Sequence, residues 1–228
     1  MSEAHYLNKL YPLQDRILQL FAAEGIKHYL TGGTALSRAF LHHRYSEDLD
    51  FFLNYDPDFE KESDRAIDLL HHHFEKVTTD NRQLHFRRLF VLQEAVTLKL
   101  DFVNDVAYHY NGFEQTNIYY KTDNPLNILS NKIAALNRQA AKDIADIIRI
   151  CNKYAFTWPD IITQAANKDN WVNEVDVLTA IKTFNQEKLL TDVAWTKPPD
   201  PFTINYEIKK ICFDIAYAGN NSLFTSSL

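Results

Sequence analysis

The N-terminal part of the chain first repeats its apolar residues at the spacing of a helix. Between residues 7 and 23, the apolar positions that fall on one helical face are Leu10, Leu13, Ile17, Leu20 and Phe21. Gly25 is expected to end this helix, because glycine readily adopts the left-handed conformation. Residues 28–30 then predict a short buried strand that runs into Thr31-Gly32-Gly33.

Further helices and strands are predicted up to about residue 104. Thr34 is a suitable N-cap for a helix through about residue 42, and another helix is expected over residues 57–76. Residues 48–53 predict a strand. A strand pair is predicted over roughly residues 84–92 and 95–104, because polar Thr97, Lys99 and Asp101 alternate there with apolar residues.

Beyond residue 123 the pattern becomes almost wholly helical. The apolar-periodic runs cover residues 126–137, 140–154, 158–166, 173–184 and 206–218. The proline-rich segment 196–201 predicts a stiff connector, because proline fixes φ. The simplest organisation is an α+β fold, with a small mixed β-sheet and flanking helices over residues 1–123 and a helical C-terminal domain over residues 124–228.

Composition narrows the class of protein further. Of 228 residues, 46% are hydrophobic and 24% are charged, and glycine is scarce, which favours helices packed on a core. The net charge of −6 argues against a protein that coats nucleic acid nonspecifically. Cys151 and Cys212 are too few for a disulfide framework, and neither a signal peptide nor an apolar run of roughly 20 residues is evident. A cytoplasmic protein is therefore expected.

Asp48 and Asp50 are the strongest candidates for chemistry. Residues i and i+2 of a strand point to the same face, so the two carboxylates would present their oxygens to one point. Oxygen ligands of this kind suit Mg²⁺, which in turn binds substrate phosphates. Upstream, Gly32 and Gly33 would let the backbone approach those phosphates closely, and the Ser46 hydroxyl could donate to them.

Asp101 would add a third carboxylate if its strand neighbours the strand of Asp48 and Asp50. Three like charges held close together repel strongly, and divalent cations relieve that cost. Two Mg²⁺ ions could then clamp the attacking and leaving oxygens of an in-line displacement. The simpler alternative is that Asp101 pairs with Lys99 on an exposed strand.

Together, the glycine pair, Asp48-x-Asp50 and a later strand aspartate resemble the nucleotidyltransferase superfold of DNA polymerase beta. Four segments narrow this resemblance to the AbiEii/AbiGii family, the nucleotidyltransferase-like toxins of type IV toxin–antitoxin systems. These segments are GGTAL, HRYSEDLDFF, KLDF and NKIAALNRQAAKDIADI. The resemblance covers about residues 10–155 and adds little for the C-terminal helices.

The resemblance implies a Mg²⁺-dependent transfer of a nucleoside monophosphate from an NTP to an acceptor. Several relatives act on the 3′ end of tRNA and are opposed by a cognate antitoxin, so tRNA and an antitoxin protein are the expected partners. Matching positions make Asp48, Asp50 and Asp101 the expected metal ligands, with Asp101 alternatively the base for the attacking hydroxyl. The expected triphosphate-binding residues are Gly32, Gly33, Thr34 and Ser46.

Lys132 and Asp143 also match positions of the family. Lys132 corresponds to a lysine that contacts phosphates, and Asp143 to the acid of an Arg-Asp motif, although Lys142 stands here in place of the arginine. Eleven residues separate the two positions, which is close to three helical turns and predicts the same face of one helix. The helical domain is accordingly expected to contribute to the active-site cleft.

Several side chains keep two interpretations. Arg44 could steer a triphosphate or tie its loop to an acidic neighbour, and Asp146 is expected to be structural. Arg82, Arg87 and Arg88 form the best local basic patch, which could guide RNA or simply protect an edge strand.

For the whole protein, a tRNA-acting toxin is the leading hypothesis. A nucleotidyltransferase that modifies a protein or small molecule and a non-catalytic module with this fold are the alternatives.

Overall fold

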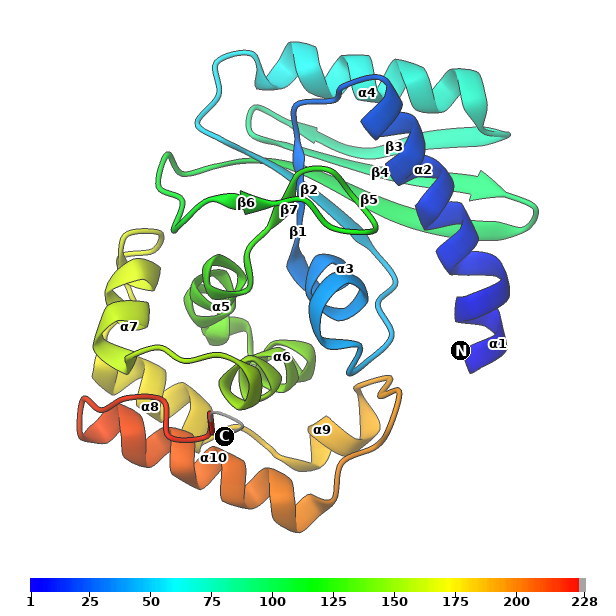
Figure 1. The fold of residues 1–228 in the computed structure, drawn as a ribbon. Coiled ribbons are helices and arrows are strands. Elements are labelled where there is room, and N and C mark those ends of the chain that lie inside the picture. The colour runs from blue at the N-terminus through cyan, green and yellow to red at the C-terminus, as the bar shows by residue number, and fades with distance from the viewer. Residues whose placement is uncertain (226–228) are drawn as a thin grey trace. The chain divides into compact units, whose positions relative to one another are not determined.

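The computed structural model describes residues 1–225 and divides them into two compact units. The first, here called the sheet unit, comprises residues 1–40 and 45–124. The second, the helical unit, comprises residues 41–44 together with the chain from residue 125 onward. Figure 1 labels the elements of both. Residues 41–44 thus join the helical unit although they stand far upstream of its helices.

The sheet unit contains four α-helices and all the strands of the described chain. Its helices are α1 (Glu3–His5), α2 (Tyr11–Ala23), α3 (Gly32–Ala35) and α4 (Phe59–His73), with π-helical segments at Tyr6–Leu10 and Leu36–Leu41. Its strands are β1 (Tyr29–Thr31), β2 (Leu49–Asn54), β3 (Lys76–Gln83), β4 (Phe86–Gln93), β5 (Val96–Asp105), β6 (Phe113–Glu114) and β7 (Thr122–Asp123).

The seven strands form one mixed sheet in the order β3-β4-β5-β2-β1-β7-β6. The central pair β2–β5 is parallel, as is β1–β7, and the other neighbours are antiparallel. The α+β class with a small mixed sheet and flanking helices is therefore confirmed.

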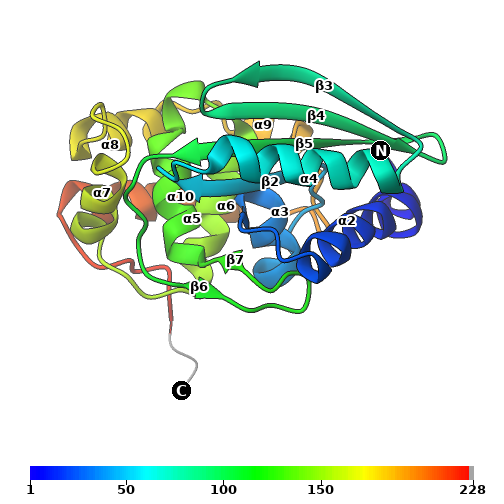
Figure 2. The ribbon, with the colours of Figure 1, turned by 90° about the horizontal axis from the view of Figure 1, so that it is seen from above.

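Alternation along β2 and β5 gives the sheet one buried face and one polar face. The rings of Phe51 and Phe102 stack with centroids 5.5 Å apart, and Phe21 of α2 packs against both. His28, just before β1, makes edge contacts with Phe102 and with Phe59 of α4. Figure 2 shows α2 and α4 beside these strands. The residues between these apolar positions therefore point to the opposite face, which carries the candidate carboxylates.

Local boundaries differ from the expectations in two places of the sheet unit. Thr34 is not an N-cap, since α3 begins at Gly32 and Thr31 precedes it. The helix expected over residues 57–76 is α4, which stops at His73, and residues 76–83 form the strand β3, which the sequence pattern does not predict. Most side chains of β3 are exposed, so it lacks the apolar alternation that identifies a strand.

The helical unit consists of helices joined by short connections. They are α5 (Pro125–Ala134), α6 (Ala141–Lys153), α7 (Trp158–Ala166), α8 (Glu174–Lys182), α9 (Glu187–Thr191) and α10 (Pro201–Ala216), with a 3₁₀ turn at Leu136–Arg138. The side chains of three N-cap residues accept a hydrogen bond from a backbone amide of the first turn: Thr157, Asn173 and Asp200. In the described chain, no helix is both long and apolar enough to cross a membrane.

Candidate functional site

The glycine pair and the carboxylates come together where β1 meets α3. Thr31 pairs with Asp50 across the antiparallel β1–β2 ladder, so Gly32 lies immediately beyond Asp50. Gly32 has φ +69°, which favours glycine, and a Cβ there would collide with the Asp50 carboxylate. The chain therefore needs glycine at position 32 for two independent reasons: its backbone conformation and the space taken by Asp50.

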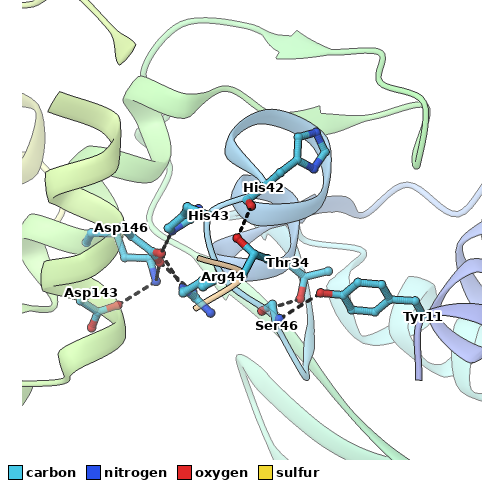
Figure 3. Close-up of polar contacts among 10 residues, drawn as sticks. Tyr11, Thr34, His42, His43, Arg44, Ser46, Asp143 and Asp146 are labelled. Carbon is cyan, nitrogen blue, oxygen red and sulfur yellow. Dashed lines mark hydrogen bonds and ion pairs between the residues drawn. The ribbon is translucent and has the colours of Figure 1, made fainter. Parts of the chain in front are cut away.

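A chain of hydrogen bonds connects α3 to the segment that precedes β2. The Thr34 hydroxyl is bonded to Ser46 Oγ at 2.8 Å and to the main-chain carbonyl of Asp48. The Ser46 amide donates to the Tyr11 hydroxyl at 3.3 Å, and Gln14 donates to the Ser46 carbonyl at 3.2 Å. Figure 3 shows Thr34, Ser46 and Tyr11 in this arrangement. The backbone that carries Asp48 is thus held from both sides within the sheet unit.

Asp101 lies beside Asp50, since the two are register partners in the parallel β2–β5 pair. Both of its carboxylate oxygens accept from the Arg88 guanidinium, each at 2.8 Å. Lys99 places its Nζ 2.8 Å from an Asp48 oxygen and 3.7 Å from an Asp101 oxygen. Burial lowers the pKa of Lys99, but the neighbouring carboxylates outweigh it and leave that pKa raised, so the ammonium stays charged.

These contacts limit which residues could hold a metal. Within residues 1–225, no group of three or more histidine, cysteine, aspartate or glutamate side chains is arranged to hold an ion. Asp48, immediately before β2, and Asp50, whose carboxylate lies against Gly32, nevertheless offer hard oxygen donors. The pair fits one divalent cation, with Lys99 beside Asp48, whereas Asp101 is contacted by both Arg88 and Lys99.

The helical unit contains a buried ion network built around Asp146 (Figure 3). Its side chain is fully buried and accepts from Arg44 Nε at 2.7 Å, Arg44 Nη2 at 2.9 Å and His43 Nε2 at 2.8 Å. Lys132 Nζ lies 2.9 Å from the other Asp146 oxygen and 2.7 Å from Asp143. Arg138 donates to the second oxygen of Asp143 at 2.6 Å.

Electrostatics keep both carboxylates of this network ionised. Burial raises the pKa of Asp146, but Arg44 and Lys132 more than compensate and hold it well below the ordinary value. Burial likewise opposes ionisation of Asp143, while Lys132 and Arg138 lower its pKa overall. Lys132 remains charged for the reciprocal reason. The result is a satisfied set of buried charges rather than isolated ones.

One expectation about this region is wrong, and the contacts of Arg44 match one of the two alternatives for that residue. Lys132 and Asp143 do not share a helix: Lys132 lies on α5 and Asp143 on α6, separated by a left-handed Gln139 with φ 51°. They meet because the two helices pack together. Arg44 is tied to an acidic neighbour, and that neighbour is Asp146. The structural role expected for Asp146 agrees with its place at the centre of this buried network.

The predicted basic patch is paired with acids of the chain. Arg82 contacts Asp64 at 2.7 Å, Arg87 contacts Glu60 at 3.2 Å, and Arg88 holds Asp101. These arginines therefore bear little uncompensated charge for an RNA backbone.

Of the predicted site residues, the sheet unit brings together Gly32, Gly33, Thr34, Ser46, Asp48, Asp50 and Asp101. The helical unit brings together Arg44, Lys132 and Asp143. Lys99 and Arg88 were not among the predicted site residues, although Lys99 had been noted as a partner for Asp101.

Comparisons with known proteins show the family and the fold of the chain. The model of the family described as "Nucleotidyl transferase AbiEii toxin, Type IV TA system" matches residues 16–202. The crystal structure of JHP933 from Helicobacter pylori is similar, with a TM-score of 0.61 and 19% identity over 95% of this chain and 94% of that one. A candidate nucleotidyltransferase from H. pylori gives a TM-score of 0.62 and 20% identity over 95% and 96% of the two chains. A search of curated protein sequences found no match.

The two structural likenesses show the fold, and the family match covers most of the chain, including the glycine pair, the three aspartates and the buried ion network. The chain therefore belongs to the AbiEii family of nucleotidyltransferase toxins of type IV toxin–antitoxin systems, and it is a nucleotidyltransferase.

Proposed function

We propose that this nucleotidyltransferase is Mg²⁺-dependent and transfers a nucleoside monophosphate from an NTP to tRNA, as a toxin opposed by a cognate antitoxin. The observation that supports the metal most directly is the placement of Asp50 against Gly32, with Asp48 two residues before it. This places the Asp50 carboxylate directly against a backbone turn whose residue has no side chain of its own. A metal-bound triphosphate needs both features.

The residues of the sheet unit divide into two roles. Asp48 and Asp50 hold the metal, which when bound neutralises charge on the transferring phosphate. The backbone of Gly32 and Gly33, with the hydroxyls of Thr34 and Ser46, holds the triphosphate. Because Thr34 and Ser46 are already bonded to each other, they are positioned before substrate arrives.

Asp101, Lys132 and Asp143 are proposed on the strength of the family resemblance. Asp101 would be a third metal ligand or the base, and either role requires that it exchange its bond to Arg88. Lys132 would contact phosphates, with Asp143 fixing its ammonium. We propose that residues 1–123 form the catalytic domain and that residues 124–228 form a helical domain that carries Lys132 and Asp143.

The test is incorporation of labelled nucleotide. Wild type is incubated with each labelled NTP, total tRNA and Mg²⁺, beside the Asp48→Asn variant and a Glu47→Gln control that alters the adjacent carboxylate. Asp48→Asn should lower incorporation at least about 100-fold, and chelation of Mg²⁺ should abolish it, because positioning and charge neutralisation provide most of this catalysis. Full incorporation by Asp48→Asn would overturn the metal assignment.

The same assay identifies the acceptor. Label should appear in the tRNA fraction, and growth arrest on expression should be rescued by the product of an adjacent antitoxin gene. The paired arginines and the net charge of −6 favour a second acceptor class, a protein or small molecule. Label in protein, with none in tRNA, would establish that alternative.

A further inference from the structure

We propose that Lys99 is a permanent cation of the site, which takes the place of a second metal ion between Asp48 and Asp101. The site then binds one divalent cation, at Asp48 and Asp50. The three carboxylates of Asp48, Asp50 and Asp101, considered without Lys99, predict two divalent cations. The proposal rests on the proposed function only in taking Asp48 and Asp50 as metal ligands.

The backbone fixes where the Lys99 side chain emerges. Leu49 pairs with Leu100 in the parallel β2–β5 ladder, and Asp48 and Lys99 immediately precede those two residues. Lys99 also lies two residues before Asp101, so both side chains point to the same face of β5. The lysine is therefore directed at the carboxylates by strand register and does not reach them from a flexible loop.

The ammonium lies between the two carboxylates that a second metal would bridge. Its Nζ is 2.8 Å from an Asp48 oxygen and 3.7 Å from an Asp101 oxygen. A metal bridging Asp48 and Asp101 would have to bind those oxygens at about 2.0–2.1 Å. It would therefore have to displace Lys99, whose side chain is only 27% exposed.

Charge balance favours the same conclusion. Three carboxylates carry three negative charges, and two of these are matched by Lys99 and Arg88. One divalent cation would leave the group with a small positive charge that substrate phosphates can balance. A second divalent ion would add two more positive charges beside an ammonium and a guanidinium, and like charges this close repel strongly.

An ordinary surface ion pair is the competing explanation, and it predicts no effect on metal binding. Exposed pairs contribute little and their partners exchange freely with solvent. Lys99 differs because it is partly buried and is shared between two carboxylates. The number of metal ions bound separates the two explanations.

The experiment is a Mn²⁺ titration of the full chain without nucleotide, followed by electron paramagnetic resonance of the free ion. Wild type should bind one Mn²⁺, and Asp50→Asn should lose it. Lys99→Met should either gain a second Mn²⁺ or bind the first at least about tenfold more tightly, equivalent to about 1.4 kcal/mol. Lys99→Arg, which keeps the charge, should still bind one.

The control is Lys76→Met, which removes an exposed lysine of β3 and changes the net charge equally. Its Mn²⁺ binding should match wild type. If Lys99→Met unfolds, as judged by circular dichroism, Lys99→Gln provides the same test with a polar side chain. Two Mn²⁺ ions in wild type, none in wild type, or unchanged binding after loss of the Lys99 charge would each overturn the proposal. Because the count needs no transfer reaction, it stands even if nucleotidyl transfer to every acceptor fails.

Discussion

Asp146→Asn should destabilise the helical unit more than any other single loss of a carboxylate there. The substitution keeps the shape of the side chain but removes its charge and puts amide protons on one side. Arg44 and Lys132 would then face a neutral group, and both are buried. An uncompensated charge in the interior is costly because water cannot solvate it.

The magnitude follows from the contacts. Asp146 accepts three hydrogen bonds from Arg44 and His43 and lies 2.9 Å from Lys132, and no part of its side chain reaches solvent. Breaking a buried ion pair on one side costs about 3–5 kcal/mol. That is a large share of the roughly 5–15 kcal/mol by which domains are stable.

Urea denaturation followed by circular dichroism measures the loss. With a slope of roughly 3 kcal/mol/M, the urea midpoint should fall by about 1–1.7 M at pH 7. Asp143→Asn is the matched control, because its partner Arg138 is 58% exposed and can turn to solvent. It should cost distinctly less than Asp146→Asn.

The pH dependence adds a sign that can be checked. The pKa of Asp146 is well below its unfolded value near 3.8, so its contribution is present above that value and is lost as pH falls through the folded pKa. The difference between wild type and Asp146→Asn should therefore shrink as pH falls below about 4. A difference under about 0.5 kcal/mol at pH 7, or one that grows in acid, would refute the reasoning.

Two further substitutions in the sheet unit test the fold and the site separately. Gly32→Ala should lower the free energy of unfolding by about 1–3 kcal/mol and abolish Mn²⁺ binding, because it strains a positive φ and displaces the Asp50 carboxylate. The control Gly112→Ala should do neither, because a Cβ there meets open space. Burial lowers the pKa of His28 to about 3, so its unfolded form takes up a proton first and wild type should lose about 2 kcal/mol between pH 6.5 and 5. His28→Gln should flatten that decline in urea titrations, and an equally steep decline would contradict the assignment to His28.

Strong periodicity was enough to predict most elements of the fold. The apolar faces of α2, α4 and α6, and the alternation in β4 and β5, are recovered with ends shifted by a few residues. The edge strand β3 was missed because its side chains are mostly exposed, so burial leaves no pattern in them. Short elements such as α9 and β7 carry too few residues for any period to be recognised.

The candidate site divides in the same way. Local sequence determined that Asp50 alternates with the buried Leu49 and Phe51 and that a glycine pair precedes it, because side-chain direction along a strand depends only on its period of two. It also carried the motifs by which the family is recognised. These features need no knowledge of how distant segments pack.

Only the tertiary structure decided what each charge contacts. Lys99 reaches Asp48 because β2 pairs in parallel with β5, fifty-one residues further along the chain, and Asp146 binds Arg44 across a separation of 102 residues. The spacing of residues along the sequence cannot predict these contacts, because they depend on which surfaces pack together. The physical reason is burial: a charge removed from water must find an opposite charge, and the fold alone determines which one lies within reach.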